Sequence, residues 1–477
     1  MKKIILILII ASLSASCSKF DGWNVDTKHP SNVNAEALVT NAQEFMATRM
    51  ASTSVNYNIF KLFAQYWTET TYTDESNYDL VNRDIGGNFW YNIYDILNDL
   101  KAAKQLIEND ASLDSTTKAN QKAVVDLMQV YLFHVLVDTY GNVPYSEALD
   151  INNVTPKYDD DQAIYNDLFD RITADVNQLS GGGSSFGSAD LYYNGDVSAW
   201  KKFGNSLKLR MAMRIADVDA VKANNMATEA LTSGVFTGNG DNFEFHFLSN
   251  PPHTNPIWSS LVQSGRHDFV VANTFVDNIL PLNDPRIPYY MDDNIIPPVG
   301  GPYGDNNSYG SYTHIGEPFH QPDMPFILLG YDEVEFLQAE AAERNMGGLT
   351  PADAESHYKK AIIASMNWWG VNPADITTYL SQPTVAYATA GSTWQEKIGL
   401  QKWLALYGRG FEAWSSWRKL GFPTMNVPPI PRTPNGEVPR RYIYPLDEPD
   451  VNQVNYNNAA TAMGGDKLLS KVFWDVN

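Results

Sequence analysis

The residue types that most often carry catalysis are present in this chain, but their spacing does not assemble a reaction centre. Eight histidines are scattered along the sequence without the HExxH spacing that places two zinc ligands on one helix face. Residues 183–187 fit G-x-S-x-G, yet a helical pattern precedes them, whereas a nucleophile elbow follows a strand. Nothing in the sequence places two carboxylates across a substrate as glycoside hydrolysis requires. We therefore predict that the protein is not an enzyme.

One acidic and amide-rich segment, DNNSYG at residues 305–310, is similar to the start of a calcium-binding loop. Such a loop ends in an acidic residue at its twelfth position. Here Gly316 takes that position, and Glu317 comes one residue late. We expect no cofactor, although the segment leaves open an irregularly bound calcium ion.

Aromatic residues in two stretches without helical periodicity are better candidates for chemistry, in the form of ligand binding. Exposed rings stack on the apolar faces of sugars, and binding sites combine concave apolar walls with a few oriented polar groups. The stretches are residues 68–83 and residues 258–312. We predict that at least one of them binds a ligand; for any single ring, packing within its own loop is the alternative. The candidate residues are Tyr72, Asp74, Asn77, Tyr78, Trp258, Arg266, Asp268, Tyr303, Asn306, Tyr309 and Tyr312.

The composition favours a large and acidic protein with a well-packed interior. The chain has 477 residues, and its 44% hydrophobic and 12% aromatic content is ample for a sizeable core. With Lys+Arg 34 and Asp+Glu 55, the formal net charge is -21. A surface of this sign repels phosphate backbones, so nucleic acid is not an expected partner.

The N-terminus has the features of an export signal. Residues 1–3 are basic at two positions, residues 4–10 are apolar, and small or polar residues lead to Cys17, the only cysteine. The apolar run is too short to span a bilayer. The motif resembles the lipobox of bacterial lipoproteins, with Ser14 where leucine is favoured. We predict a signal peptide over residues 1–16, lipidation of Cys17 and a tether over residues 17–34; ordinary secretion with a buried cysteine is the alternative.

Apolar residues recur at helical spacing over most of the remaining chain, which predicts long helices stacked in antiparallel pairs, as in helical solenoids. Residues 236–325 and 423–449 are rich in proline, glycine and asparagine and are predicted to be irregular, apart from a short helix at 273–280. We expect one mostly α domain over residues 35–477, with the irregular ligand-face insert at about 236–325. The expected helices cover residues 35–65, 89–107, 115–139, 159–179, 197–216, 219–233, 331–345 and 350–369.

Residues 398–421 form the stretch around which we expect the fold to be organised. Bulky apolar residues recur there at steps of one, three or four, which predicts a central core helix. Gly408 and Gly410 lower its helix propensity, so a kink or a close backbone approach is expected. Three charged residues among the aromatics need partners if they are buried: Arg409, Glu412 and Arg418.

Several sequence blocks follow one another behind the lipoprotein-like signal. They are MQVYLFHVLVDTYGNVPYSEAL (128–149), LKLRMAMRIA (207–216), NDPRIPYY (283–290), GYDEVEFLQAEAAER (330–344), QKWLALYGRGFEAWSSWRKLGFP (401–423) and PRRYIYPLDEPDVNQVNYNNA (439–459). With these blocks in this order, the chain resembles the SusD/RagB family of outer-membrane nutrient-binding lipoproteins, and within it the SusD-like branch.

The resemblance implies a mostly α-helical protein with a tetratricopeptide-like scaffold and an irregular ligand-binding face. It implies an acyl anchor at Cys17 and a position on the outer membrane facing the cell exterior. It also implies a SusC-type TonB-dependent transporter as partner, with the helical repeats facing the barrel and the protein acting as a lid. Binding, not turnover, is the family's activity. Because ligand residues vary between members, the candidate residues above rest on the aromatic-loop argument alone.

Three functions from different classes remain open at this point. The leading hypothesis is capture of a nutrient for import, in the first place an oligosaccharide, with a peptide as in the RagB branch as the alternative ligand. The second is a transporter lid or adaptor with no ligand specificity of its own. The third, a secreted hydrolase, has the least support because the sequence lacks a coherent catalytic set.

Overall fold

The computed structural model describes residues 33–179 and 182–477. The expected signal peptide, Cys17 and most of the expected tether lie outside these residues. Helices dominate the described chain, as the sequence predicts. They are α2 (Ala35–Ala51), α3 (Phe60–Phe63), α4 (Ile85–Asn109), α5 (Ser115–Tyr140), α6 (Asp161–Gln178), α7 (Val197–Ile215), α8 (Ala220–Ser233), α9 (Pro256–Trp258), α10 (Asn273–Ile279), α11 (Ile287–Tyr290), α12 (Tyr331–Glu343), α13 (Pro351–Trp368), α14 (Pro373–Ser381), α15 (Trp394–Ala405), α16 (Gly410–Leu420), α17 (Glu448–Val451) and α18 (Gln453–Ala462).

Strands within the described residues are short and form three antiparallel pairs. Two of the pairs join segments that are far apart in the sequence, and the third closes a loop. The pairs are β1 (Trp67–Glu69) with β5 (Phe269–Val271), β2 (Val143–Pro144) with β3 (Tyr158–Asp159), and β4 (Phe243–Phe245) with β6 (Phe326–Leu329).

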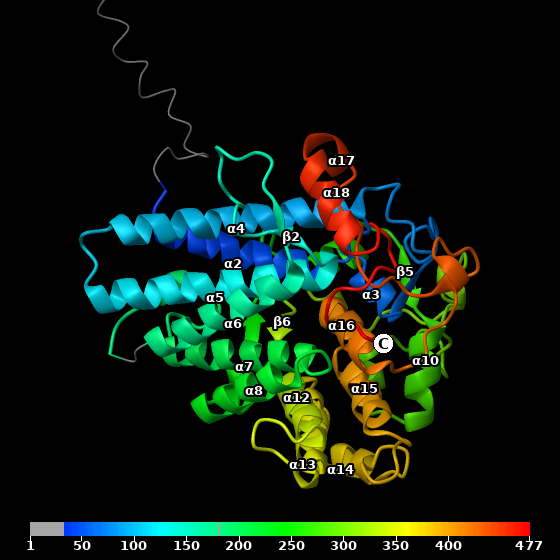
Figure 1. The fold of residues 1–477 in the computed structure, drawn as a ribbon. Coiled ribbons are helices and arrows are strands. Elements are labelled where there is room, and N and C mark those ends of the chain that lie inside the picture. Colours follow the sequence, from blue (N-terminus) through cyan, green and yellow to red (C-terminus); the bar gives the residue numbers. More distant parts are fainter. Residues whose placement is uncertain (1–32, 180–181) are drawn as a thin grey trace, which may run out of the picture.

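The long helices stack in layers, which confirms the expected tetratricopeptide-like scaffold. α2 packs on α4, α4 on α5, α5 on α6, α6 on α7, and α7 on α8, while α12 packs on both α13 and α7 (Figure 1). Aspartate side chains cap the N-termini of five of these helices by accepting backbone N–H groups: Asp84 for α4, Asp114 for α5, Asp160 for α6, Asp196 for α7 and Asp219 for α8. Local sequence therefore sets where these helices begin.

α5 is the innermost helix of this stack. From Ala123 to Tyr140 every residue is buried, because neighbours cover the helix on all sides. Among the described helices, α5 alone is long and apolar enough to cross a membrane, but its apolar window is 100% buried inside the fold. A core helix meets the same test of length and composition, and that is the role of α5 here.

The prediction of a single helix over residues 398–421 is wrong, because the chain forms two helices, α15 and α16, joined by a turn. Gly408 has a φ of +86°, a conformation that side-chain-bearing residues rarely adopt. A Cβ on Gly410 would lie 2.5 Å from the backbone nitrogen of Lys61, so α16 approaches α3 at backbone distance. The expected close approach is therefore present, and it lies at the first residue of α16.

The charged residues of this stretch do find partners. Arg409 forms a two-pronged ion pair with Asp332. The Glu412 carboxylate lies 2.5 Å from Arg214 Nη2. The Arg418 guanidinium lies between the rings of Trp414 and Trp474, 3.5 and 4.6 Å from their centroids. Trp474 is fully buried, so the C-terminal segment docks on α16 as its apolar sequence indicates.

The predicted helix over residues 35–65 is also interrupted. α2 ends at Ala51, where the Lys61 ammonium donates to the carbonyl oxygens of Ala51 and Ser52 at 2.7 and 3.0 Å. These bonds satisfy carbonyls that a continuing helix would have used. α3 then leads directly into β1. The irregular character expected for residues 236–325 is confirmed, with α10 as its longest helix.

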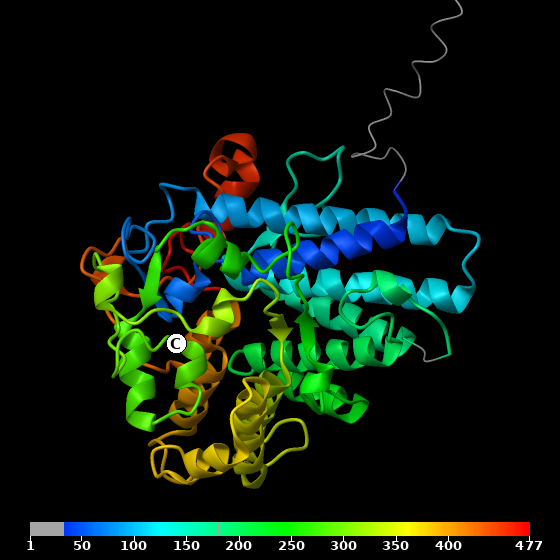
Figure 2. The same cartoon turned by 180° about the vertical axis from the view of Figure 1, so that it is seen from behind.

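α3, β1 and β5 lie beside α15 and α16, at the side of the molecule away from the loop 110–114 that joins α4 to α5 (Figures 1 and 2). The irregular segments gather at this side, whereas the long helices form the other. The scaffold thereby presents one loop-rich face, as the sequence predicts.

Candidate functional site

The β1–β5 pair brings the two predicted aromatic stretches together. Beyond the paired residues, the Thr70 amide donates to the Asp268 carbonyl oxygen at 2.9 Å. On the other side of β1, the Asn307 side chain donates to the Glu69 carbonyl oxygen at 3.0 Å. Residues 70–83, 261–268 and 301–314 therefore meet around the end of one short ribbon, although more than 170 residues separate the first from the second.

A stack of three rings is the main surface feature of this site. The Tyr309 ring lies parallel to His267 on one face, with centroids 4.1 Å apart, and to His314 on the other, with centroids 3.8 Å apart. His314 Nε2 also lies 3.0 Å from the Tyr309 carbonyl oxygen. His267 is exposed, whereas Tyr309 and His314 are half-buried. The outer face of the stack is thus an imidazole, supported by two rings behind it.

Polar and aromatic groups surround this stack. Tyr72 is 72% exposed and holds a left-handed backbone with a φ of 56°, a conformation that costs energy for a bulky residue and often occurs at ligand sites. Arg266 Nε pairs with Asp268 Oδ2 at 2.7 Å on the surface. Asn306 is exposed, and Asp74 and Tyr312 are half-buried.

Three of the predicted ligand residues are instead part of the support beneath the site, which corrects their assignment. Tyr78 and Tyr303 are buried, with exposed fractions of 0% and 3%, and their rings pack against each other. The Asn77 side chain is also buried; it donates to the Gly304 carbonyl oxygen and accepts the Ile430 amide. These side chains are not available to a ligand. Their polar groups are hydrogen-bonded within the protein, and their rings are covered by other side chains.

Trp258 belongs to a different element from the ring stack, and that element packs elsewhere. It is half-buried at the end of α9, and α9 packs against α2 and the turn Glu317–His320. The structure therefore brings together most of the exposed candidates but leaves Trp258 on another element.

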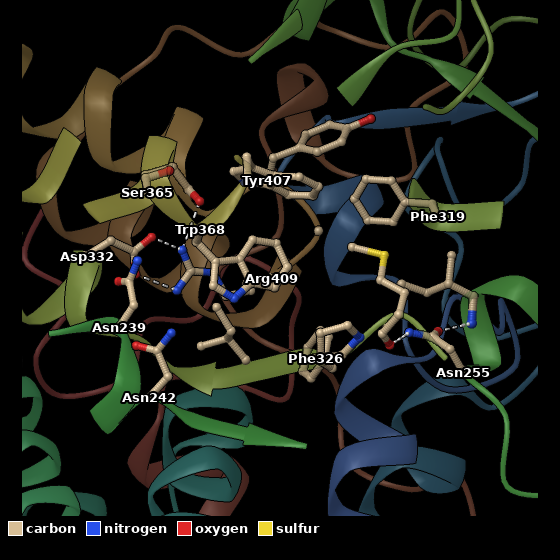
Figure 3. A pocket seen from close by; sticks show the side chains of 17 residues that line it. Asn239, Asn242, Asn255, Phe319, Phe326, Asp332, Ser365, Trp368, Tyr407 and Arg409 are labelled. Atoms are coloured by element: carbon tan, nitrogen blue, oxygen red, sulfur yellow. Dashed lines mark hydrogen bonds and ion pairs between the residues drawn. The ribbon is translucent and has the colours of Figure 1, made fainter. Parts of the chain in front are cut away.

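An enclosed pocket beside Arg409 does not suit a sugar. Figure 3 shows the Arg409–Asp332 ion pair at its wall, with Trp368, Phe319 and Tyr407 around it. Its volume of about 30 Å³ holds about one water molecule. An open groove of about 480 Å³ over α2 is larger. Phe245 in its wall is buried, and its exposed imidazoles, His246 and His253, each lie beside a carboxylate instead of in a ring stack. Neither matches the ring stack as a platform for a ligand.

Several polar atoms of the calcium-like segment are used within the protein, although Asn307 Oδ1 is buried and accepts no hydrogen bond from the described residues. Asp305 Oδ1 accepts the Asn306 amide, and the Asn307 side chain turns inward to the carbonyl oxygens of Glu69, Pro302 and Asp305. Within residues 33–179 and 182–477, no group of three or more His, Cys, Asp or Glu side chains is placed to hold a metal ion. A calcium ion here stays an untested prediction.

Sequence reasoning missed His267 and His314. In a sequence, histidines are singled out by zinc-ligand spacing, and the eight histidines of this chain lack that spacing. Their signal is positional, since both lie in the same irregular stretch as Tyr309. An imidazole ring is planar and can extend an aromatic surface, but only the folded chain shows that these two enclose Tyr309.

The scaffold and the site together define a class: a helical-repeat binding protein that carries its candidate ligand site on loops. The chain belongs to the SusD-like family, whose model is described as starch-binding associating with outer membrane and matches residues 27–445. Members are binding proteins associated with the outer membrane, and the helical scaffold described above is the fold of this family.

Solved structures agree with this placement. A chitin-binding protein is 31% identical, with a TM-score of 0.78, and the match covers 93% of this chain and 100% of that chain. A chitin-binding SusD homologue from Flavobacterium johnsoniae is 24% identical, with a TM-score of 0.77, over 92% of this chain and 98% of the other. A SusD homologue from Bacteroides thetaiotaomicron VPI-5482 is 23% identical, with a TM-score of 0.78, over 94% and 100%. No curated protein sequence is similar enough to match.

Proposed function

We propose that this protein captures an oligosaccharide at the cell surface and delivers it to a SusC-type TonB-dependent transporter. Membership of a family of starch-binding, outer-membrane-associated proteins supports the class of ligand. The 31% identical chitin-binding protein supports a β-linked amino-sugar chain as the first ligand to test. Anchoring through acyl chains on Cys17, with the site facing the cell exterior, belongs to the same proposal.

The observation that carries the proposal is the exposed face of His267 on the His267–Tyr309–His314 stack. Both faces of Tyr309 are covered, so a sugar ring would lie on His267 and not on the tyrosine. Tyr72 offers a second exposed ring on the neighbouring loop. The Arg266–Asp268 pair and Asn306 provide donors and acceptors for hydroxyl or acetamido groups.

Calorimetric titration of the protein truncated after Cys17 tests this function. The panel contains chitin oligosaccharides, maltooligosaccharides, other glycans and peptides, and each mixture is also assayed for new products. Saturable binding of a sugar without products is the expected result. Release of products would contradict a pure binding role, and binding of peptides alone would replace the oligosaccharide with the RagB-like ligand.

A transporter lid without a ligand of its own makes the opposite prediction for the same experiment. It predicts no binding across the panel together with stable co-purification of a TonB-dependent barrel. The delivery step is tested separately, by purifying the full-length protein from membranes and identifying the proteins that remain bound to it.

A further inference from the structure

Two glutamate carboxyl groups meet in the interior beneath residues 70–83. Glu69 is the last residue of β1, and Glu75 lies in the turn that follows; their exposed fractions are 3% and 0%. Each lies within hydrogen-bonding reach of the other. Burying two ionised carboxylates side by side is costly, so the pair calls for a proton or a compensating cation.

The hydrogen-bond partners of the two groups differ. Glu69 Oε2 accepts the Ser76 amide at 2.9 Å and the Ser76 hydroxyl at 2.8 Å. Glu75 Oε1 lies 2.5 Å from Arg83 Nε. Glu75 Oε2 is buried and receives no donor from the described residues, if both groups are ionised. A proton on the free oxygen of Glu69 would supply that missing donor.

The surroundings provide only one counter-charge to the pair. Arg83, whose side chain is 37% exposed, is the cation that the described structure places against it. Tyr303, from the opposite segment, lies near Glu69 but donates its hydroxyl to the Leu62 carbonyl oxygen, and Phe269 stands across from Glu69 in the β1–β5 ribbon. Asp79 on the same loop is balanced separately by Arg432, 3.4 Å away. One cation for two carboxylates leaves room for one shared proton.

We propose that Glu69 and Glu75 share one proton and that this carboxyl–carboxylate hydrogen bond is the positioning element that fixes residues 70–83 at the ligand site. Glu69 donates, and Glu75, ionised and paired with Arg83, accepts. Glu69 and Glu75 touch no ligand; they hold the turn that carries Tyr72 and Asp74. The inference rests on the proposed function in that it takes residues 70–83 as one wall of that site.

The electrostatics predict how the order of residues 70–83 changes with pH. Burial, followed by the neighbouring Glu75 carboxylate, raises the pKa of Glu69 well above its ordinary value of 4.5. Burial also raises the pKa of Glu75, against the opposing effects of Glu69 and Arg83. The folded loop therefore keeps a proton that the unfolded loop releases above about pH 4.5. Order in the loop is greatest on the acid side and falls as the pH rises toward the raised pKa of Glu69.

The substitution Glu69→Gln tests the shared proton directly. An amide is planar like a protonated carboxyl group: its oxygen can accept the Ser76 bonds, and its NH₂ can donate to Glu75 without titrating. In the wild type, amide hydrogen exchange of residues 70–83, corrected for intrinsic rates, should quicken about tenfold between about pH 5.5 and about pH 8.5. In Glu69→Gln this dependence should be absent.

Controls separate the pair from general effects of charge. Glu355→Gln, on the exposed face of α13, should keep the wild-type pH profile. The infrared difference spectrum between the wild type and Glu69→Gln should contain one carboxylic-acid C=O band at neutral pH. Should Glu69→Gln fail to fold, Glu75→Gln should reduce the pH dependence in its place, because its amide can donate to an ionised Glu69 and only the burial of Glu69 then raises the pKa of that group.

The result that overturns the inference is an equal pH profile in the wild type and in Glu69→Gln, or a wild type whose loop exchange does not change with pH. These readouts need no ligand, so they decide the inference even if the proposed function fails. Titration with chitohexaose adds the functional arm: the affinity of the wild type should fall as the pH rises, and that of Glu69→Gln should not. Chitohexaose binding with equal pH dependence in both proteins would contradict the positioning role while leaving sugar binding intact.

Discussion

His267 forms the outer layer of the ring stack, and only its free face is available for a ligand. Replacing it with alanine removes that face and exposes Tyr309, whose ring would no longer be held between two partners. We expect His267→Ala to lower the affinity for the sugar that binds in the titration by about tenfold. This corresponds to about 1.4 kcal/mol, which is the scale of one aromatic contact. Calorimetry measures the loss.

His246→Ala is the matched control, because the His246 side chain is 73% exposed but belongs to the groove over α2. It should leave the affinity unchanged. Equal affinities of the wild type and His267→Ala, with saturable binding retained, would mean that the ligand site lies elsewhere on the molecule.

Two tyrosines of residues 70–83 have opposite roles although they are six residues apart. Tyr72 is 72% exposed, so Tyr72→Ala should weaken ligand binding and change the free energy of unfolding by no more than about 0.5 kcal/mol. Tyr78 is buried against Phe63 and Tyr303, so Tyr78→Ala should cost about 3 kcal/mol of stability. Urea unfolding and calorimetry on both variants measure these effects; a stable Tyr78→Ala protein would contradict the supporting role.

This contrast also shows how far the site could be predicted from the sequence. Composition located both aromatic stretches, but it could not distinguish Tyr72 from Tyr78, because the loop has no regular periodicity that assigns residues to an inside and an outside. The meeting of the two stretches depends on the pairing of β1 with β5, three residues each and 200 residues apart. A strand that short leaves almost no sequence pattern.

At the scale of elements, the long helices were predictable because their apolar spacing and aspartate caps are local signals. The junction between α15 and α16 was not, because the bulky residues continue through it at helical spacing. Gly408 turns the chain between the two helices with a φ of +86°, and α3 then lies so close that only glycine fits at position 410, the first residue of α16. Helix propensity at two glycines indicated a weak point but not a complete break.

The α3–α16 contact supports a prediction of its own. A methyl group on Gly410 would meet the Lys61 backbone nitrogen at 2.5 Å and the Phe60 carbonyl carbon at 2.7 Å. Backbone atoms cannot move aside as a flexible side chain can, so Gly410→Ala should destabilise the protein by about 2 kcal/mol. Denaturant unfolding measures the change.

Gly240→Ala provides the comparison, since open space surrounds that position and its φ is not in the left-handed region. It should alter the stability by no more than about 0.5 kcal/mol. Because α3 leads directly into β1, Gly410→Ala should also loosen the β1–β5 ribbon, visible as faster amide exchange at residues 67–70. A Gly410→Ala protein as stable as the wild type would show that α3 can shift without cost.

At the scale of the whole molecule, binding and location are predicted to be separable. The residues of the described core and of the ring stack come after position 32, whereas the predicted acyl anchor is Cys17. The net charge of -21 gives the protein no electrostatic attraction to an anionic membrane surface, so we expect acyl chains to be its attachment there. We expect Cys17→Ser to abolish incorporation of a labelled fatty acid and to release the protein from the outer membrane. The affinity of the purified variant for sugar should stay within about twofold of the wild type, since the exposed candidate ligand residues begin at Tyr72, far along the chain from Cys17. Membrane fractionation, fatty-acid labelling and calorimetry measure the three effects. Retention of unlabelled Cys17→Ser protein in the outer membrane would instead identify a protein contact, such as the transporter, as the anchor that holds it there.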